Sequence, residues 1–315
     1  MRVKIKALTL IWTGDIDRGC RGIKETGIIG SLRWWYEALV RGLGGYACDP
    51  TSKEKCELDQ RRLQKAIREG KSIQEALDEQ ICPSCQLFGC TGWSRRFRLE
   101  VSGIHENDIE KGRTSTAGLK PNKIMYWNFY FFKNLSYEQK WLFKKTLWVI
   151  ENYGAIGGRT TWKPNGEWGT DYGLIKVENY GKLKQWVASS NKTEVKSWLE
   201  ENKEKLGKKN KSEWFNFKFY WIVKDEYLSR DQINRIVRRN PSDPRRYLSN
   251  ATDFDRWLGG KIGESKKIFS FCNPKRVFGY VRNSNELEEI KKRLENELGT
   301  PLNFKTGEEI LEGLE

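Results

Sequence analysis

The chain has 315 residues, and its 57 lysines and arginines exceed its 42 aspartates and glutamates by 15 charges. An excess of this size favours a polyanionic partner, nucleic acid before an anionic membrane surface. Aromatic residues make up 13% of the chain and include 14 tryptophans, which argues against disorder and calls for a large core or for base stacking.

Several classes of protein are excluded at once. No stretch approaches the 18 apolar residues of a membrane span, and the alternating start from Met1 to Lys6 has no signal-peptide core, so we expect a cytoplasmic protein without a membrane partner. The seven cysteines are odd in number and clustered, which disfavours a secreted disulfide framework. The single histidine excludes any mechanism or metal site that needs two.

Strands and helices alternate in the first half. Residues 3–12 read as a strand in which Val3, Ile5 and Ala7 share one face. The apolar residues then switch to the other parity at Leu8, Leu10 and Trp12, which indicates either a bulge or a strand buried on both faces. A helix at 27–43, strands at 95–104 and 123–132, a helix from the capping box at Ser136 to about 152 and a strand at 172–178 follow. This order is typical of the split βαβ, or ferredoxin-like, fold.

The second half gives a similar but weaker pattern. The expected elements are a helix at 192–206, a strand at 214–223, a helix at 229–239, hairpin strands at 268–271 and 276–281, and a helix at 284–298. We therefore predict an α+β protein of two ferredoxin-like (RRM-like) domains, 1–180 and 181–315. A polar insertion at about 46–81, helical from about 58 to 77, belongs to the first domain.

The helix at 27–43 carries two residues that its apolar stripe does not explain. Leu32, Trp35 and Leu39 fit a core-facing stripe, whereas Arg33 and Trp34 lie off it. A glycine-lined helix start leaves N–H groups that attract phosphates, and Arg33 lies one turn in. Trp34 is either a stacking platform or a cover for a neighbouring sheet.

A glycine-rich loop at 154–169 carries Arg159, Trp162 and Lys163, which could supply charge and stacking for a single strand. The alternative is a long hairpin-like loop with incidental charges. The loop is not a Walker A motif, because no Gly-Lys-Ser/Thr closes it.

The cysteines suggest one structural zinc ion. Cys82 and Cys85 form a tight knuckle, and Cys48 and Cys56 at the start of the insertion could supply the other two thiolates, with Cys90 as a rival fourth ligand. The alternative is that these cysteines are small buried hydrophobic residues.

Three segments, in this order, resemble the RAMP superfamily of CRISPR–Cas proteins: residues 27–41, 87–97 and 154–169. The SLRWWYEAL stretch at 31–39 and the CQLFGCTGWSRRF stretch at 85–97 are similar to the first subunit of the Cmr complex, the type III-B RNA-guided effector. The resemblance covers about the first 180 residues. The cysteine pairs depart from the minimal RAMP pattern.

The resemblance implies a non-catalytic subunit near the 3′ end of the guide (crRNA), contacting target RNA and a neighbouring RAMP subunit. By position it implies RNA-facing roles for Arg33, Trp34, Arg95, Arg96 and Arg159. With Arg18, Arg21, Trp162 and Lys163 added, these form the predicted RNA-binding set.

Some RAMP relatives cut RNA, so two alternatives stay open. One is an endoribonuclease that uses a loop aspartate, here Asp15 or Asp17, although Arg18 and Arg21 adjoin them. The other is a basic single-stranded RNA-binding protein outside any complex. His105, beside Glu106 and Asp108, fits a solvated surface residue. We expect no enzymatic activity.

Overall fold

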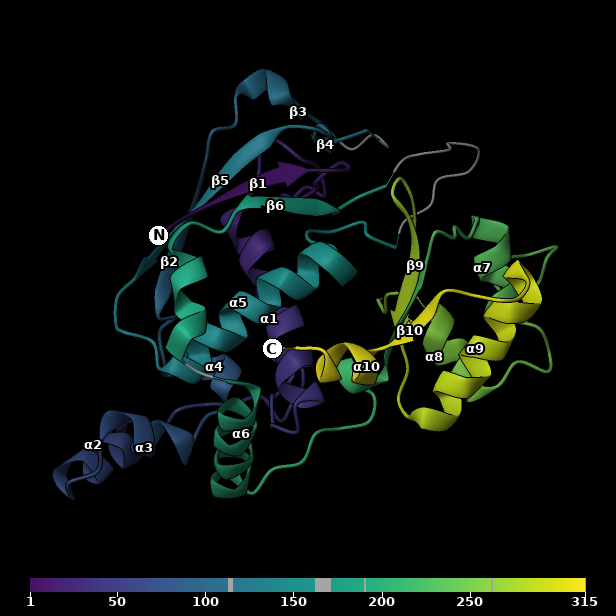
Figure 1. Cartoon of the computed structure of the whole chain (residues 1–315). Helices are drawn as coiled ribbons and strands as arrows, with labels where there is room; N and C mark the ends of the chain where they lie inside the picture. Colours follow the sequence, from purple (N-terminus) through teal and green to yellow (C-terminus); the bar gives the residue numbers. More distant parts are fainter. Residues whose placement is uncertain (113–115, 162–170, 190, 262, 315) are drawn as a thin grey trace.

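The computed structural model describes residues 1–112, 116–161, 171–189, 191–261 and 263–314. Within them the chain is an α+β protein with two four-stranded antiparallel sheets and one small two-stranded sheet (Figure 1). None of the described helices is both long enough and apolar enough to cross a membrane.

The first half builds one sheet in the order β2-β5-β1-β6. Its elements are β1 (Arg2–Ala7), α1 (Glu25–Gly42), β2 (Phe97–Ser102), β5 (Ile124–Phe131), α5 (Tyr137–Tyr153) and β6 (Ile175–Asn179). Helices α1 and α5 pack together on one face of the sheet (Figure 1), where alternate strand residues such as Ile5 and Trp127 are fully buried. The predicted capping box at Ser136 is present and begins α5.

The predicted parity switch along the first strand is wrong. Thr9 and Ile11 are buried like Ala7, so the odd residues keep facing inward while Leu8 and Leu10 stay half-buried. After Ala7 the chain leaves the ladder and makes only single bridges, such as Leu10 with Tyr172, so neighbouring loops cover its outer face. A register shift does occur, but it lies earlier, at Lys4 and Ile5 opposite β6.

The insertion forms short helices instead of one long helix. They are α2 (Gln60–Arg68), α3 (Ile73–Asp78) and, just beyond it, α4 (Pro83–Phe88). The break comes at Gly70, which has a φ of 90°, and Ser72 then caps α3 with a capping box. These helices surround a separate small core that contains the cysteines of the insertion, and α2 and α3 project from the molecule (Figure 1).

The second half repeats the strand order of the first, as β8-β9-β7-β10. Its elements are β7 (Tyr220–Lys224), α7 (Arg230–Ile236), α8 (Asp253–Gly259), β8 (Ile268–Cys272), β9 (Lys275–Tyr280), α9 (Ser284–Leu298), β10 (Phe304–Thr306) and α10 (Gly307–Glu312). The helix at 284–298 and the hairpin are where the sequence predicts them. The predicted strand at 214–223 is instead a short 3₁₀ helix, η3 (Phe217–Phe219), followed by β7.

The remaining elements connect or decorate the two halves. They are η1 (Glu106–Asp108), β3 (Ile109–Glu110), β4 (Gly118–Leu119), η2 (Gly181–Ser189) and α6 (Lys192–Leu206). Although α6 follows the predicted boundary at 181, it packs against α5 and α3.

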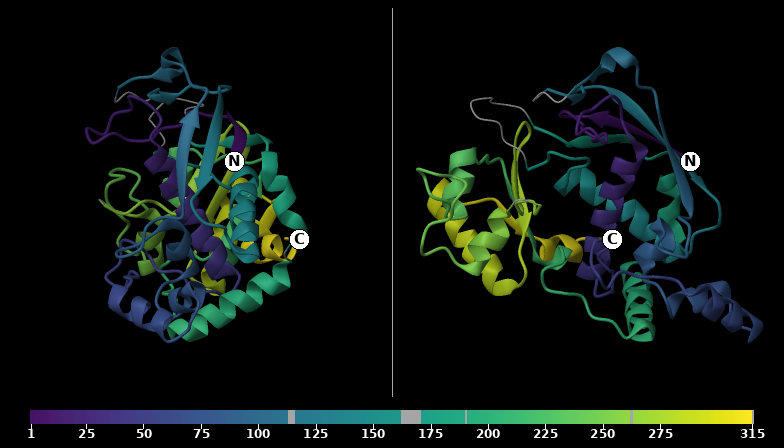
Figure 2. Two further views of the ribbon diagram at one scale, coloured as in Figure 1. Left: turned by 90° about the vertical axis from the view of Figure 1, so that its left-hand side faces the viewer. Right: turned by 180° about the vertical axis from the view of Figure 1, so that it is seen from behind.

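Both halves contribute to one aromatic core. Trp35 of α1 lies among the rings of Phe215, Tyr220 and Phe278, and the Tyr220 hydroxyl donates to the Tyr153 carbonyl at 2.5 Å. Helix α10 returns to the first half, where Ile310 is buried in its core; Figure 2 shows this return from behind. The second sheet therefore docks on α1 through buried contacts, which places α1 at the junction of the two halves.

Candidate metal centre and nucleic-acid interface

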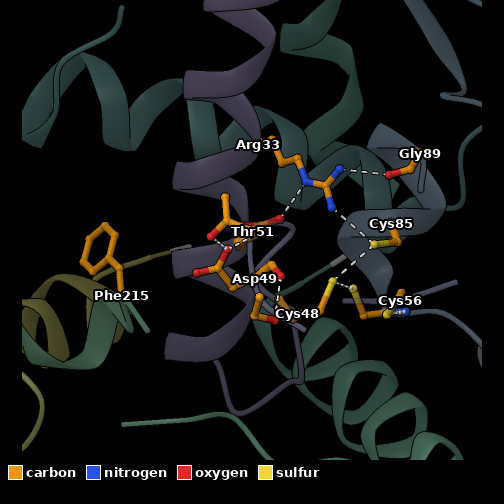
Figure 3. Close-up of polar contacts among 12 residues, drawn as sticks. Arg33, Cys48, Asp49, Thr51, Cys56, Cys85, Gly89 and Phe215 are labelled. Carbon is orange, nitrogen blue, oxygen red and sulfur yellow. Dashed lines mark hydrogen bonds and ion pairs between the residues drawn. The ribbon is translucent and has the colours of Figure 1, made fainter. Parts of the chain in front are cut away.

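The structure brings together the four cysteines that the sequence pairs. The Sγ atoms of Cys48, Cys56, Cys82 and Cys85 all lie within 4.8 Å of one another, and all four residues are buried. Two of the Sγ–Sγ distances are 3.4 Å, from Cys48 to Cys85, and 3.9 Å, from Cys82 to Cys48 (Figure 3 shows the first). All four are free thiols, so the cluster is not a pair of disulfides.

These spacings fit one tetrahedral ion. A Zn–S bond of about 2.3 Å gives a tetrahedron with S–S edges of about 3.8 Å, close to both Sγ–Sγ distances. Hydrogen bonds from the neighbouring thiols lower the pKa of Cys48. Cys90, the rival ligand, is half-buried and lies outside the group of four. The cluster could therefore hold one metal ion.

Helix α4 explains two of the four positions. Cys82 is its N-cap residue and Pro83 opens its first turn, so Cys82 and Cys85 lie one turn apart at the same end of the helix. The backbone N–H of Cys82 also points at Cys56 Sγ, 3.5 Å away. A short helix thus presents half of the ligand set.

Arg33, predicted to face RNA, lies against this cluster. Its guanidinium donates to Glu37 Oε1 at 2.7 Å, to the Gly89 carbonyl at 2.9 Å and to Cys85 Sγ at 3.3 Å (Figure 3). Burial lowers its pKa, but Glu37 and Cys85 together raise it above the ordinary value, so the group stays charged. The structure thus directs this side chain into the molecule.

The other predicted arginines fall into two groups. Arg96 is 8% exposed and donates to the amide oxygens of Gln139 and Gln74, at 3.2 and 3.3 Å. Arg95 is half-buried and donates to the Phe97 carbonyl at 2.8 Å. Arg18 and Arg21 are exposed on the first loop, where Arg21 pairs with Asp17 at 2.5 Å. The buried position of Arg96 suits a structural role better than an RNA contact.

Trp34 and Arg159 line one cavity of about 480 Å³ between the two halves of the chain. Helix α1 supplies Gly30 and Trp34, the loop after α5 supplies Arg159, and the second half supplies Lys266 and Tyr280. The Trp34 ring packs with Phe215 and Tyr280 in a triangle of rings, with centroids 4.4 and 5.8 Å from that of Trp34 and 4.3 Å from each other. One wall is therefore aromatic, and basic side chains stand around it.

Lys266 is a cavity residue that sequence reasoning missed. Burial lowers its pKa to about 8, helped by the positive charges of Arg239 and Arg230. Among the residues that the structure describes, no carboxylate pairs with it. Lys266 and Arg159 both line the cavity, and two cations there favour an anionic ligand.

The glycines of the glycine-rich loop are required by packing against Trp12. A Cβ at Gly157 would lie 2.5 Å from the Trp12 carbonyl oxygen, and one at Gly158 would lie 2.5 Å from the Trp12 ring. The loop therefore closes over Trp12, and Arg159 lies over the same ring at 4.7 Å. Trp162 and Lys163 lie outside the described residues.

Comparison with known proteins gives a family match and similar solved structures. The family model of the RAMP superfamily matches residues 4–162. The crystal structure of apo Cmr1 from Pyrococcus furiosus is similar at 10% identity and a TM-score of 0.48, over 97% of this chain and 98% of that one. A cryo-EM structure of the type III-B Cmr-beta, bound to cognate target RNA and AMPPnP in the presence of ssDNA, is similar at 13% identity and a TM-score of 0.48. That similarity covers 94% of this chain and 98% of the other.

No curated protein matches the sequence. The family match, however, spans more than half of the chain and includes β1, α1, β2, β5 and α5. The chain belongs to the RAMP superfamily.

Proposed function

We propose that the chain is a non-catalytic, RNA-binding subunit of a cytoplasmic type III-B CRISPR effector, the Cmr complex. The observation that carries the proposal is the family match over residues 4–162. The net charge of +15 supports an RNA partner. Within such a complex its partners are the guide RNA near its 3′ end, the target RNA and other RAMP subunits.

We interpret the two repeated halves as ferredoxin-like domains, 1–180 and 181–315. Both have the connectivity βαββαβ around antiparallel sheets of the same strand order, which supports this interpretation. Domain pairs commonly bind ligands at their junction, and the cavity beside Trp34 lies at this one.

We place the principal RNA contact at that cavity. Its aromatic wall can stack an unpaired base, and Lys266 and Arg159 can meet the adjoining phosphates. Arg18, Arg21, Trp162 and Lys163 remain predicted contacts. Arg33 and Arg95 donate to groups within the protein and so contribute less.

The absence of catalysis is part of the proposal. His105 is exposed at the surface. Asp17 pairs with Arg21, and Asp15 lies 3.5 Å from Lys24, so both loop carboxylates have basic neighbours. Proton transfer to and from a ribose would need positioned acid and base groups, which these pairings do not favour.

A structural zinc ion completes the proposal. Cys48, Cys56, Cys82 and Cys85 are the ligands, and the ion would close the insertion that lies between the two cysteine pairs. Because the domain has its own core, the metal would stabilise the insertion and not the whole fold.

Salt dependence tests RNA binding by the purified full chain. With about six phosphates contacted, log K should fall against log salt with a slope near −4, at about −0.7 per contact on a single strand. Fluorescence titration of labelled RNA at several salt concentrations measures the slope. Binding that does not change with salt would contradict phosphate contact.

A further inference from the structure

The buried charges around α1 are unbalanced if the four cysteines are neutral. Arg41 is 5% exposed and donates to the carbonyls of Ala47, Cys48 and Phe215, at 2.9, 2.9 and 2.8 Å. Arg33 is held nearby with only 17% of its side chain exposed. Glu37 lies between them, 2.7 Å from Arg33 and 3.7 Å from Arg41. Two cations therefore share one buried carboxylate.

The next carboxylate, Asp49, acts on Arg41 electrostatically but forms no ion pair with either arginine. Asp49 is half-buried at the edge of the group, where its Oδ1 accepts from the Thr51 backbone N–H and hydroxyl (Figure 3). Among the three buried groups Arg33, Glu37 and Arg41 one positive charge is left over, and burying an unpaired charge is costly. A single divalent ion on four thiolates carries a net charge of −2, so such a centre would place negative charge beside the two arginines.

Arg33 contacts α4 at both of its ends. Its Nη2 donates to Cys85 Sγ in the first turn, and its Nη1 donates to the carbonyl of Gly89, the C-cap residue. One guanidinium on α1 thereby fixes the helix that presents two of the four thiols. Arg41 fixes the backbone at a third cysteine of the cluster, because it donates to the carbonyl of Cys48.

We propose that Arg33 is the positioning residue of a Zn(Cys)₄ centre: it donates a hydrogen bond to the metal-bound Cys85 thiolate and docks α1 on the metal. The inference rests on the structural zinc of the proposed function. Outer groups that hydrogen-bond to metal ligands orient them and tune the metal, and their loss costs roughly 10–100-fold in metal affinity. Arg33 thus serves the metal centre, while its neighbour Trp34 faces the cavity between the halves.

The test uses the full chain purified without added metal. Elemental analysis should find one zinc per wild-type chain and no iron. Arg33→Ala should bind zinc roughly 10–100-fold more weakly in chelator competition, and Arg33→Lys, which keeps the charge, should recover part of that loss. Arg98→Ala removes an exposed arginine from β2 and should bind zinc as the wild type does.

A spectroscopic readout separates positioning from folding. In the cobalt-substituted protein, Arg33→Ala should move the thiolate-to-cobalt charge-transfer band to lower energy, because the thiolate loses a donor. Wild-type zinc affinity and an unshifted band in Arg33→Ala would overturn the proposal. A wild-type chain that contains no metal, or iron, would contradict both this proposal and the proposed structural zinc. RNA binding by that same chain would still support the proposed RNA-binding function.

Discussion

The ring of Trp34 on α1 faces the ring of Tyr280 on β9, with centroids 5.8 Å apart and planes inclined at 66°. Because the two residues come from different halves of the chain, the contact joins those halves at the wall of the cavity. The geometry of this wall depends on how the second sheet docks on α1. A substitution here therefore changes both docking and ligand binding, and cleaner tests use the charged groups nearby.

Replacing Lys266 with alanine should weaken RNA binding without destabilising the protein. A charge-assisted contact to a phosphate contributes about 1.5–3 kcal/mol, so the affinity should fall roughly tenfold or more. The salt slope should become less negative by about 0.7. Because no described carboxylate pairs with the ammonium group, the melting temperature should not fall. Lys275→Ala removes an exposed lysine of the second half and is the matched control; equal losses in both variants would argue against the cavity.

Lys266 should also make RNA binding depend on pH. Its pKa in the folded chain is about 8, because of burial and of the positive charges of Arg239 and Arg230. RNA affinity should therefore decline as the pH rises from about 7 to about 9.5 and the ammonium loses its proton. Lys266→Arg should lack this decline. An identical pH profile in both proteins would assign the titration to another group.

The same group gives a stability prediction with a definite sign. The folded-state pKa of Lys266 lies below the ordinary value of 10.5, so the unfolded chain binds more protons between pH 8 and 10.5. The contribution of this lysine to the free energy of unfolding should therefore increase from pH 8 to pH 10.5, and below pH 8 it should stay constant at its lowest value. Thermal melts of the wild type and Lys266→Ala at about pH 7 and about pH 10 test this. Any advantage in melting temperature of Lys266→Ala over the wild type at about pH 7 should become smaller, or reverse, at about pH 10.

Arg96→Ala should lower stability and leave RNA affinity unchanged. The substitution removes the donor to Gln139 and Gln74 in a buried site, which typically costs about 1–3 kcal/mol of unfolding free energy. Urea unfolding gives the stability, and RNA titration of the folded variant gives the affinity. Arg98, two residues along on the exposed face of β2, is the control. A selective loss of RNA affinity in Arg96→Ala would restore the role that the sequence suggested.

The isolated protein should not cut RNA. Guide precursor and target RNA, each incubated with and without magnesium, should stay intact, because Asp15 and Asp17 lie beside Lys24 and Arg21 and the single histidine is exposed. Cleavage that disappears in Asp17→Ala would replace this account with that of a RAMP nuclease.

The cysteine cluster could be found from sequence because its signal is local. A Cys-x-x-Cys pair before a short helix and two cysteines at the start of the insertion are enough to propose four ligands. The pairing of Glu37 with Arg33 and Arg41 is also predictable, because the three residues are spaced four apart and so share one helix face.

Other features depend on how distant segments pack together, so the local sequence does not predict them. Lys266 stands at the cavity only because the second sheet packs on α1, so nothing in the residues around it marks the position. Arg96 adjoins Arg95 in sequence, but the start of β2 turns Arg96 inward to two glutamines from α3 and α5. The parity of Thr9 and Ile11 likewise results from the loops that cover the chain after Ala7.

The central claim is membership of an RNA-guided effector, and affinity purification from the native host tests it most directly. The bound RNA is sequenced and the bound proteins are identified, with purification from a strain lacking the other RAMP genes as the control. The account predicts guides derived from CRISPR repeats, together with other RAMP proteins. Recovery of bulk cellular RNA without RAMP partners would contradict it and favour a general RNA-binding protein.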